Sequence, residues 1–284
     1  MADLSDDKLL ADFDQLVEEG VIVYGPHELV EVDCDGYPFE FRICPALKRK
    51  PHQVGAVLDS SFDKSRKWGP GSDMYCPDER LIIKQLNGTH DLAHNLFCVD
   101  RPQYVVLTSD SYKKQHEPLD EDDMKVILEM LKELKGFYVI YNCGEAAGCS
   151  RSHKHIQGLI GPPTAFGSFI DEEKSKSIPF KFFSHHFEQG FEGTSSSELL
   201  KTYEALLEKA KDALNTPKES ICPHNVVLWQ DWLMVIPRRS GTIGGASANS
   251  GGMFGSVWVT DQDEVDKWTR IGVRQVLEGL GLPR

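Results

Sequence analysis

Residues 153–157 read His-Lys-His-Ile-Gln, and both the fold and the chemistry of the chain can be argued from this stretch. A turn-rich run over 142–152 precedes it, with the sequence Asn-Cys-Gly-Glu-Ala-Ala-Gly-Cys-Ser-Arg-Ser. Gly-Leu-Ile follows over 158–160. Because β-forming residues flank the stretch and small, polar residues mark the turn before it, we expect one strand over 153–160.

The predicted strand sorts its side chains onto two faces, because successive residues of a strand point in opposite directions. His153, His155 and Gln157 would share one face, and Lys154 and Ile156 would share the other. Two imidazoles and an amide in a row are unusual for a core face. They suit a catalytic face, because imidazole can act as a nucleophile or as an acid and base near neutral pH.

The turn before the strand is rich in glycine and other small residues, which let backbone N–H groups approach an anion closely. Ser150 and Ser152 add hydroxyl donors, and Arg151 adds a positive charge. A phosphate held there would lie beside the histidine face. A histidine nitrogen can attack phosphorus to form a labile phosphoramidate, and a glutamine amide can donate to a phosphoryl oxygen as charge develops on it. The stretch therefore predicts covalent nucleotidyl transfer.

Two other interpretations of the histidines are open. Alternate histidines on a strand could ligate zinc, with Cys149 or the pair His185-His186 completing the site. However, 153–157 contains no Asp or Glu, and Gln157 is a poor zinc ligand, so we predict no metal ligands. The last alternative is a pair of ordinary, partly buried histidines with a structural role.

The rest of the chain mixes helical and extended patterns without a regular strand–helix–strand period, so we predict an α+β fold with a mainly antiparallel sheet and flanking helices. We treat 1–284 as one domain, with an N-terminal catalytic part over about 1–165 and a C-terminal part over about 195–284. Segment 164–194 has no regular pattern, and the Gly- and Ser-rich segment 240–256 is either a flexible linker or a loop whose backbone approaches a ligand. Helices are expected over about 6–19, 121–135, 196–213 and 262–279, and strands over 21–24, 29–32, 39–43, 103–108, 137–141, 225–229, 232–236 and 257–259.

The composition limits the partners and the compartment. The net charge of −13 argues against broad contact with nucleic acid or an acidic membrane, but it leaves room for a local basic pocket that binds a small anion. No apolar run is long enough to span a bilayer, and the N-terminus lacks the apolar core of a signal peptide. The seven cysteines are scattered without a Cys-x-x-Cys pair, which indicates reduced thiols and a cytoplasmic, or also nuclear, protein.

The His-x-His-x-Gln pattern of 153–157 resembles the signature of histidine-triad-like nucleotidyltransferases, in which Gln replaces the third His. Two branches share it. Gly148-Cys-Ser150 with Asn142 resembles galactose-1-phosphate uridylyltransferases, whereas His-Lys-His-Ile-Gln is closer to the fungal diadenosine tetraphosphate (Ap4A) phosphorylases, also called ATP adenylyltransferases. Segments along most of the chain resemble the second branch: 42–51, 89–90, 95–99, 104–108, Gln115, 118–119, 225–238 and 249–251.

This resemblance implies a histidine-triad-like fold and assigns a role to each matching residue. His155 would be the nucleophile that takes AMP, and Gln157 would hold the α-phosphate. His153 would orient the site or help in proton transfer. Substrate contacts would come from Lys50, Thr89, His90, Asn95, Asn142, Gly148, Cys149, Ser150, Arg151, Asn249, Ser250 and Gly251.

The implied activity is phosphorolysis of Ap4A to ADP and ATP through an AMP–histidine intermediate, together with the reverse adenylyl transfer. The partners would be small nucleotides and phosphate, and no cofactor is required, although related enzymes sometimes use Mg²⁺. A uridylyltransferase acting on a sugar 1-phosphate and a non-catalytic nucleotide-binding protein are the alternatives.

Three residues depart from the family pattern. Gln is usual where Arg151 stands here, and Lys is usual at the positions of Leu96 and Thr260. These changes leave the catalytic pair intact and bear on substrate preference.

Overall fold

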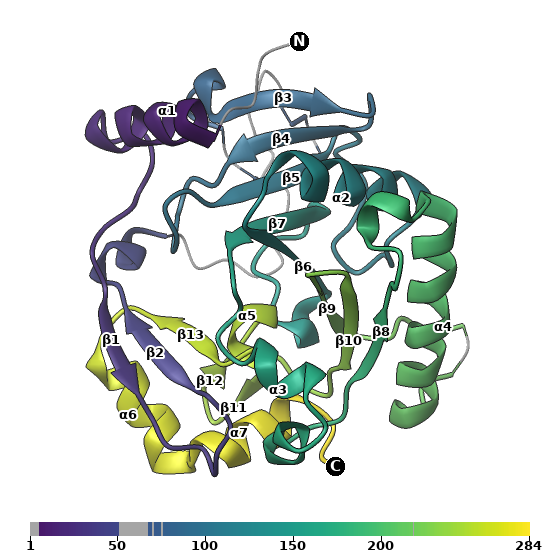
Figure 1. The fold of residues 1–284 in the computed structure, drawn as a ribbon. Coiled ribbons are helices and arrows are strands. Elements are labelled where there is room, and N and C mark those ends of the chain that lie inside the picture. Colours follow the sequence, from purple (N-terminus) through teal and green to yellow (C-terminus); the bar gives the residue numbers. More distant parts are fainter. Residues whose placement is uncertain (1–5, 51–67, 70, 75, 218) are drawn as a thin grey trace.

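The structure, a computed structural model, describes residues 6–50, 68–69, 71–74, 76–217 and 219–284. One large sheet crosses the molecule, with helices along its faces and a smaller sheet below it in the view of Figure 1. The helices are α1 (Asp6–Glu18), α2 (Glu121–Glu133), α3 (Phe166–Ile170), α4 (Ser196–Leu214), α5 (Ser250–Met253), α6 (Gln262–Ile271) and α7 (Val273–Leu280). The strands are β1 (Glu28–Glu31), β2 (Glu40–Ile43), β3 (Ile82–Leu86), β4 (His90–His94), β5 (Tyr104–Thr108), β6 (Phe137–Cys143), β7 (His155–Ile160), β8 (Phe183–His186), β9 (His224–Trp229), β10 (Trp232–Pro237), β11 (Thr242–Ile243), β12 (Ala246–Ser247) and β13 (Ser256–Val259).

The large sheet has the strand order β3-β4-β5-β7-β6-β9-β10-β8, and all of its neighbouring strands pair antiparallel. The central histidine strand, β7, lies between β5 and β6, where His155 pairs with Leu107 and Gln157 pairs with both Val105 and Ile140. The hairpin β9–β10 continues the sheet from β6. Strands from both halves of the chain therefore build the surface that carries the histidines.

Helices α2 and α4 cover one face of this sheet (Figure 1). Their amphipathic character explains the arrangement, because the apolar stripe of each helix can pack only against another apolar surface. Ile156 of β7 points into this layer and belongs to the same hydrophobic core as Ile127 of α2 and Leu199 of α4. Side chains that alternate with Ile156 must therefore point to the opposite face.

The opposite face of the sheet is covered by the smaller sheet and by the C-terminal helices. Strand β2 lies in the middle of that sheet, antiparallel to β1 and parallel to β13. Phe41 of β2 packs edge-on against Trp268 of α6, in a core that also holds Ile140 and Ile236 of the large sheet. This packing brings the loop before β13 close to the strands of the histidine face.

Most of the predicted elements are confirmed. The fold is α+β with a large antiparallel sheet and flanking helices, and α1, α2 and α4 match their predicted ranges to within two residues. The strand predicted over 153–160 begins at His155, while His153 forms an isolated bridge with Lys114. None of the helices in the described part of the chain combines the length and the apolar character that crossing a bilayer requires.

Some predictions are wrong. The strand expected over 21–24 reduces to one bridge, between Val23 and Phe97. The helix expected over 262–279 breaks at Gly272, whose φ of +100° ends α6 before α7 begins. Segment 164–194 contains α3 and β8, and 240–256 holds β11, β12 and α5. Pattern analysis misses these elements because each has only two to five residues, which is too short for a reliable period.

Candidate active site

Two cavities lie beside the histidine strand, on the sheet face opposite α2 and α4. The first, here called the Gly148 cavity, has a volume of about 280 Å³ and is bounded by the turn 148–150 and by residues of 247–252. The second, here called the Trp68 cavity, has a volume of about 290 Å³ and is lined by His155, by Trp68 and other apolar side chains, and by polar and charged ones. Five of the described residues line both cavities: Lys50, Asn95, Phe97, Ser150 and Gln157.

His155 is held in the tautomer that a nucleophile needs. The residue is 6% exposed, and its Nδ1 lies 2.8 Å from the carbonyl oxygen of His153. A carbonyl oxygen can only accept a hydrogen bond, so Nδ1 carries the proton and Nε2 keeps its lone pair. Burial lowers the pKa of His155 below its ordinary value, although the bond to His153 opposes this shift. The ring is therefore neutral and nucleophilic near pH 7.

The backbone of His155 is fixed by Gln115, whose side chain is buried. The Oε1 atom of Gln115 accepts from the N–H of His155 at 2.7 Å, and its Nε2 donates to the carbonyl oxygens of His155 and Asn142 at 3.0 Å and 3.1 Å. This amide therefore joins the start of β7 to the end of β6.

His153 has no nitrogen left for chemistry. Its Nε2 lies 2.9 Å from the carbonyl oxygen of Thr108 and must donate there, so Nδ1 accepts from the hydroxyl of Ser72 at 2.7 Å. The side chain is fully buried and lines neither cavity. Burial and the adjacent His155 lower the pKa of His153 to about 4. Of its two predicted roles, this geometry favours orientation, through the His153 carbonyl that fixes the ring of His155.

The turn before β7 packs against the loop that carries α5. Gly148 has a φ of +81°, and a Cβ there would collide with the carbonyl oxygen of Ala248. Glycine is therefore required on both steric and conformational grounds. Asn142, near the end of β6, joins α5 to β9, because its Oδ1 accepts from Nδ2 of Asn225 at 2.8 Å and from N and Oγ of Ser250 at 2.8 Å and 2.6 Å.

Arg238 extends this network into the interior. It is 1% exposed, and its guanidinium donates to Oδ1 of Asn225 at 2.6 Å and to the carbonyl oxygens of Ala147, Ser240, Ala248 and Leu280. None of these partners is a carboxylate, and burial lowers the pKa of Arg238 to about 9. Neutral oxygens accept each of these hydrogen bonds from the guanidinium. Through Ala147 and Ala248, Arg238 joins the turn before β7 to the loop that carries α5, beside the Gly148 cavity.

Lys50 and Arg151 supply positive charge to the cavity walls. Lys50 lines both cavities and Arg151 lines the Trp68 cavity. Burial, together with the nearby Arg151 guanidinium, lowers the pKa of Lys50 to about 8. No Asp or Glu lies among the described residues that line the two cavities. A cationic wall without carboxylates suits a phosphate chain.

Comparison with known families gives two matches that divide the chain between them. Residues 10–169 match the Ap4A phosphorylase N-terminal domain, and residues 176–283 match the ATP adenylyltransferase C-terminal domain. The first match alone spans more than half of the chain. The chain belongs to the Ap4A phosphorylase family.

Individual relatives of this Ap4A phosphorylase family member come from Saccharomyces cerevisiae. Diadenosine 5',5'''-P1,P4-tetraphosphate phosphorylase 2 is 27% identical over 229 residues, which is 68% of this chain and 70% of the relative. The protein APA1 is 25% identical over 192 residues, 57% of this chain and 60% of the relative. The crystal structures of the yeast Ap4A phosphorylase Apa2 with AMP and with Ap4A superpose with TM-scores of 0.76 and 0.75. They are 22% and 21% identical to this chain, and each match covers 98% of this chain and 97% of the yeast chain. These matches confirm the resemblance and the fold predicted from the sequence.

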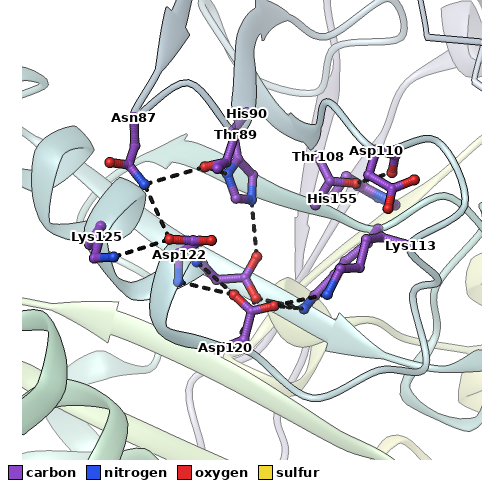
Figure 2. A network of polar contacts seen from close by, with 12 residues as sticks. Asn87, Thr89, His90, Thr108, Asp110, Lys113, Asp120, Asp122, Lys125 and His155 are labelled. Atoms are coloured by element: carbon purple, nitrogen blue, oxygen red, sulfur yellow. Dashed lines mark hydrogen bonds and ion pairs between the residues drawn. The ribbon is translucent and has the colours of Figure 1, made fainter.

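Thr89 and His90 are the two predicted substrate contacts that the structure does not bring to the site of this family member. His90 is buried, and its Nε2 lies 3.1 Å from Oδ1 of Asp123 in α2, while Thr89 bonds to the His90 ring at 2.9 Å. Figure 2 shows both in a polar network that also contains Asp120, and His155 lies apart from it. They belong to the helix-covered face of the sheet, because the partner of the His90 ring, Asp123, is a buried residue of α2.

The remaining predicted contacts lie at or beside the cavities of this Ap4A phosphorylase family member. Asn95 and Ser150 line both cavities, whereas Asn142, Gly148, Cys149, Asn249 and Gly251 line only the Gly148 cavity. Ser250 is fully buried and acts through Asn142. Of the departures from the family pattern, Leu96 lines the Trp68 cavity and Thr260 lines the Gly148 cavity.

The zinc interpretation finds no support in the geometry. His185 and His186 are exposed on β8, the edge strand farthest from β3 in the sheet order. Over the described ranges of the chain, no cluster of three or more His, Cys, Asp or Glu side chains is placed to hold a metal ion.

Sequence reasoning missed three residues that build the site. Ser72 supports the ring of His153, and Asp73 accepts from the backbone N–H of Ser152 and His153 at 2.7 Å and 2.9 Å. Gln103 donates to Gln157 at 3.0 Å. One feature of the sequence could have identified Gln103: it is a polar residue directly before the apolar run of β5. In the fold it is almost fully buried.

Proposed function

We propose that this protein catalyses the phosphorolysis of Ap4A, and the reverse adenylyl transfer, through covalent AMP on His155. The observation that carries the proposal is the ring of His155, whose Nδ1–H is bound by a carbonyl oxygen while Nε2 keeps its lone pair beside the Trp68 cavity. The family match and the relatives named for Ap4A support the choice of an adenine dinucleotide over a sugar nucleotide.

The first step transfers AMP to the enzyme. Nε2 of His155 attacks the α-phosphorus, a nitrogen–phosphorus bond forms, and the bond from that phosphorus to the bridging oxygen breaks. The oxygen leaves with the electron pair as part of ATP. Gln157, on the wall between the two cavities, would donate to a non-bridging α-oxygen as its charge grows. Lys50 and Arg151 would balance the charge of the leaving phosphates.

The second step returns the enzyme to its starting state. An oxygen of orthophosphate attacks the phosphorus of the AMP–His155 intermediate, the nitrogen–phosphorus bond breaks, and ADP is released. Nε2 recovers its lone pair, so His155 needs no net proton transfer over the cycle. In the reverse direction, ADP and then ATP would form Ap4A.

The two cavities would divide the substrate. Because they share the wall that contains Gln157, a dinucleotide could place one nucleoside in each cavity and its phosphate chain along Lys50 and Ser150. The Trp68 cavity offers apolar and aromatic surface for stacking a base. The Gly148 cavity adds Tyr138 and Trp258 together with polar amides.

The decisive test is the intact mass of the protein after incubation with Ap4A in the absence of phosphate. We expect the wild-type mass to rise by one AMP and to return to its starting value when phosphate is added. The variant His155→Ala should form no adduct and should lose phosphorolysis by about 10³-fold or more.

The matched control for this test is His185→Ala, since His185 is an exposed histidine on the edge strand. It should form the adduct as the wild type does. Full phosphorolysis by His155→Ala would contradict the proposal. An adduct from UDP-glucose but not from Ap4A would select uridylyl transfer, and tight Ap4A binding without any adduct would select a nucleotide-binding protein without turnover.

We propose that turnover needs no resident metal, with Mg²⁺ acting at most as a companion of the substrate phosphates. The charges that face the phosphate chain come from Lys50 and Arg151. Phosphorolysis measured in excess EDTA is therefore expected to retain at least about a tenth of its rate. Complete loss in EDTA, restored by Mg²⁺, would contradict this proposal.

We further propose a cytoplasmic, or also nuclear, location. No disulfide links two cysteines in the described part of the chain, as expected in a reducing compartment. Fractionation of cells that express the tagged protein tests this, and recovery in secretory compartments would contradict it.

A further inference from the structure

Gln103 lies where the turn after β4 enters β5, at the base of the Gly148 cavity. It is 3% exposed, so both ends of its amide need hydrogen-bond partners. Its backbone carbonyl accepts from the N–H of Asn95 at 2.9 Å, and Oδ1 of Asn95 accepts from the N–H of Phe97 at 3.3 Å. The turn is thus bonded to itself, and it holds Gln103 in a fixed place.

The orientation of two consecutive amides follows from one backbone group. The N–H of Val99 lies 2.8 Å from the side chain of Gln103 and can only donate, so the atom that faces it must be Oε1. The other end of Gln103, Nε2, is then the donor toward Gln157, at 3.0 Å. The atom of Gln157 that receives it must be Oε1. This leaves Nε2 of Gln157 as the end that can donate into the cavities.

The two orientations of the Gln157 amide have opposite effects on a phosphate. With Nε2 toward the ligand, the amide donates to a phosphoryl oxygen and stabilises the charge that grows during transfer. With Oε1 toward the ligand, two oxygens that carry negative charge face each other. A glutamine side chain without hydrogen-bond partners can adopt either orientation. A neighbouring group must therefore hold the Gln157 amide with Nε2 toward the ligand.

We propose that Gln103 is a positioning residue that holds the Gln157 amide with its NH₂ group toward the α-phosphate. This inference rests on the proposed adenylyl transfer and adds a residue that touches neither His155 nor the reacting phosphorus. It explains why a buried glutamine stands at the start of an otherwise apolar strand.

The direct test is Gln103→Glu, which keeps the length of the side chain and the acceptor for Val99. Its carboxylate offers only acceptors, so Gln157 must turn its Nε2 toward residue 103 and its Oε1 toward the phosphate. At pH 8 we expect kcat for Ap4A phosphorolysis to fall about 10²-fold, with a much smaller change in KM, because the lost interaction strengthens in the transition state.

The pH profile provides a readout that a merely structural defect would not produce. When the new carboxyl group is protonated, it can again donate to Oε1 of Gln157 and restore the original orientation. The ratio of the Gln103→Glu rate to the wild-type rate should therefore rise as the pH falls from 8 to about 5.5. The ionisation of His155 affects the rate of both proteins in the same way, so its effect cancels in this ratio.

A second variant and a double-mutant comparison keep the test decisive if Gln103→Glu folds poorly. In Gln103→Met the Gln157 amide is free to turn, so kcat should fall about tenfold without the pH effect. In a Gln157→Ala background, either substitution at Gln103 should change kcat by less than about threefold, because no amide is left to orient. Gln85→Glu, an exposed change on β3, is the matched control and should leave kcat unchanged.

Two results would overturn the inference while leaving the adenylyl transfer intact: wild-type kcat in Gln103→Glu at pH 8, or an undiminished loss in the Gln157→Ala background. A wild-type protein that forms no AMP adduct and shows no turnover would instead overturn the proposed function, and the inference with it.

Discussion

The chemistry of the site depends on single hydrogen bonds whose direction is fixed by backbone groups. The carbonyl oxygen of His153 can only accept, so it places the proton of His155 on Nδ1. The N–H of Val99 can only donate, so it sets the amide of Gln103 and, through it, that of Gln157. Backbone groups do not flip, and the reactive atoms therefore inherit their orientation from the fold.

A prediction at the residue scale concerns the pH dependence of the first step. Burial lowers the pKa of His155 below 6.5, and only the neutral ring can attack phosphorus. The ring of His155 therefore stays neutral down to about pH 6.5, and the rate of AMP–enzyme formation in a single turnover should fall only in more acidic solution. Protonation of Lys50, whose pKa is about 8, should raise this rate, not lower it, as the pH falls from 8 to 7. Rapid-quench measurements with wild-type protein test this expectation. A rate that already halves between pH 8 and 7 would contradict it.

At the scale of elements, the strand that carries His155 is anchored from behind by helix α2. Lys154 is 1% exposed, and its Nζ lies 2.6 Å from Oδ2 of Asp123, which is equally buried, and 2.8 Å from the carbonyl oxygen of Pro118. Asp123 also bonds to His90 and to the backbone N–H of Asp120 at the start of α2. The ion pair thus fixes the strand on the face away from the cavities.

This anchor predicts an asymmetric response to mutation. Removal of one partner leaves a buried charge unpaired, so Lys154→Met should lower the free energy of unfolding by about 3–5 kcal/mol, whereas the double variant Lys154→Met, Asp123→Leu should recover much of that loss. Urea unfolding at pH 7 measures both values. A double variant that is less stable than Lys154→Met by several kcal/mol would show that the polar network itself, and not the lone charge, carries the stability.

At the scale of the whole molecule, three buried histidines link stability to pH. Burial lowers the pKa of His94, His153 and His224 to about 4 in each case. The unfolded chain therefore binds more protons than the folded chain between about pH 6.5 and 4. The stability contributed by neutral burial is complete above pH 6.5 and is lost as the pH falls through that window.

The expected size of this effect is about 1.4 kcal/mol per pH unit for each histidine once the pH is well below 6.5. Urea unfolding of His224→Gln at several pH values should show a slope smaller than that of the wild type by about this amount. His186→Gln is the control, because His186 is exposed, and its slope should match the wild type. Equal slopes in all three proteins would contradict the assignment.

The sequence by itself determined what depends on local pattern. The His-Lys-His-Ile-Gln stretch predicted the nucleophile candidate and the family, and the helical periodicity placed α1, α2 and α4. Alternation along a strand correctly separated Lys154 and Ile156 from His155 and Gln157. These features are local because backbone geometry sets the period within a few residues.

Only the tertiary structure decided which distant segments meet at the histidines. Strand order places β5 and β6 beside β7, and this brings Gln103 to Gln157 and Gln115 to His155. The same order puts His90 behind the sheet, although its motif resembled a substrate contact. Such pairings are set by burial across the whole core. Alternation along a strand separates two faces, but only the packing of a second layer decides which face is covered by helices and which faces the cavities.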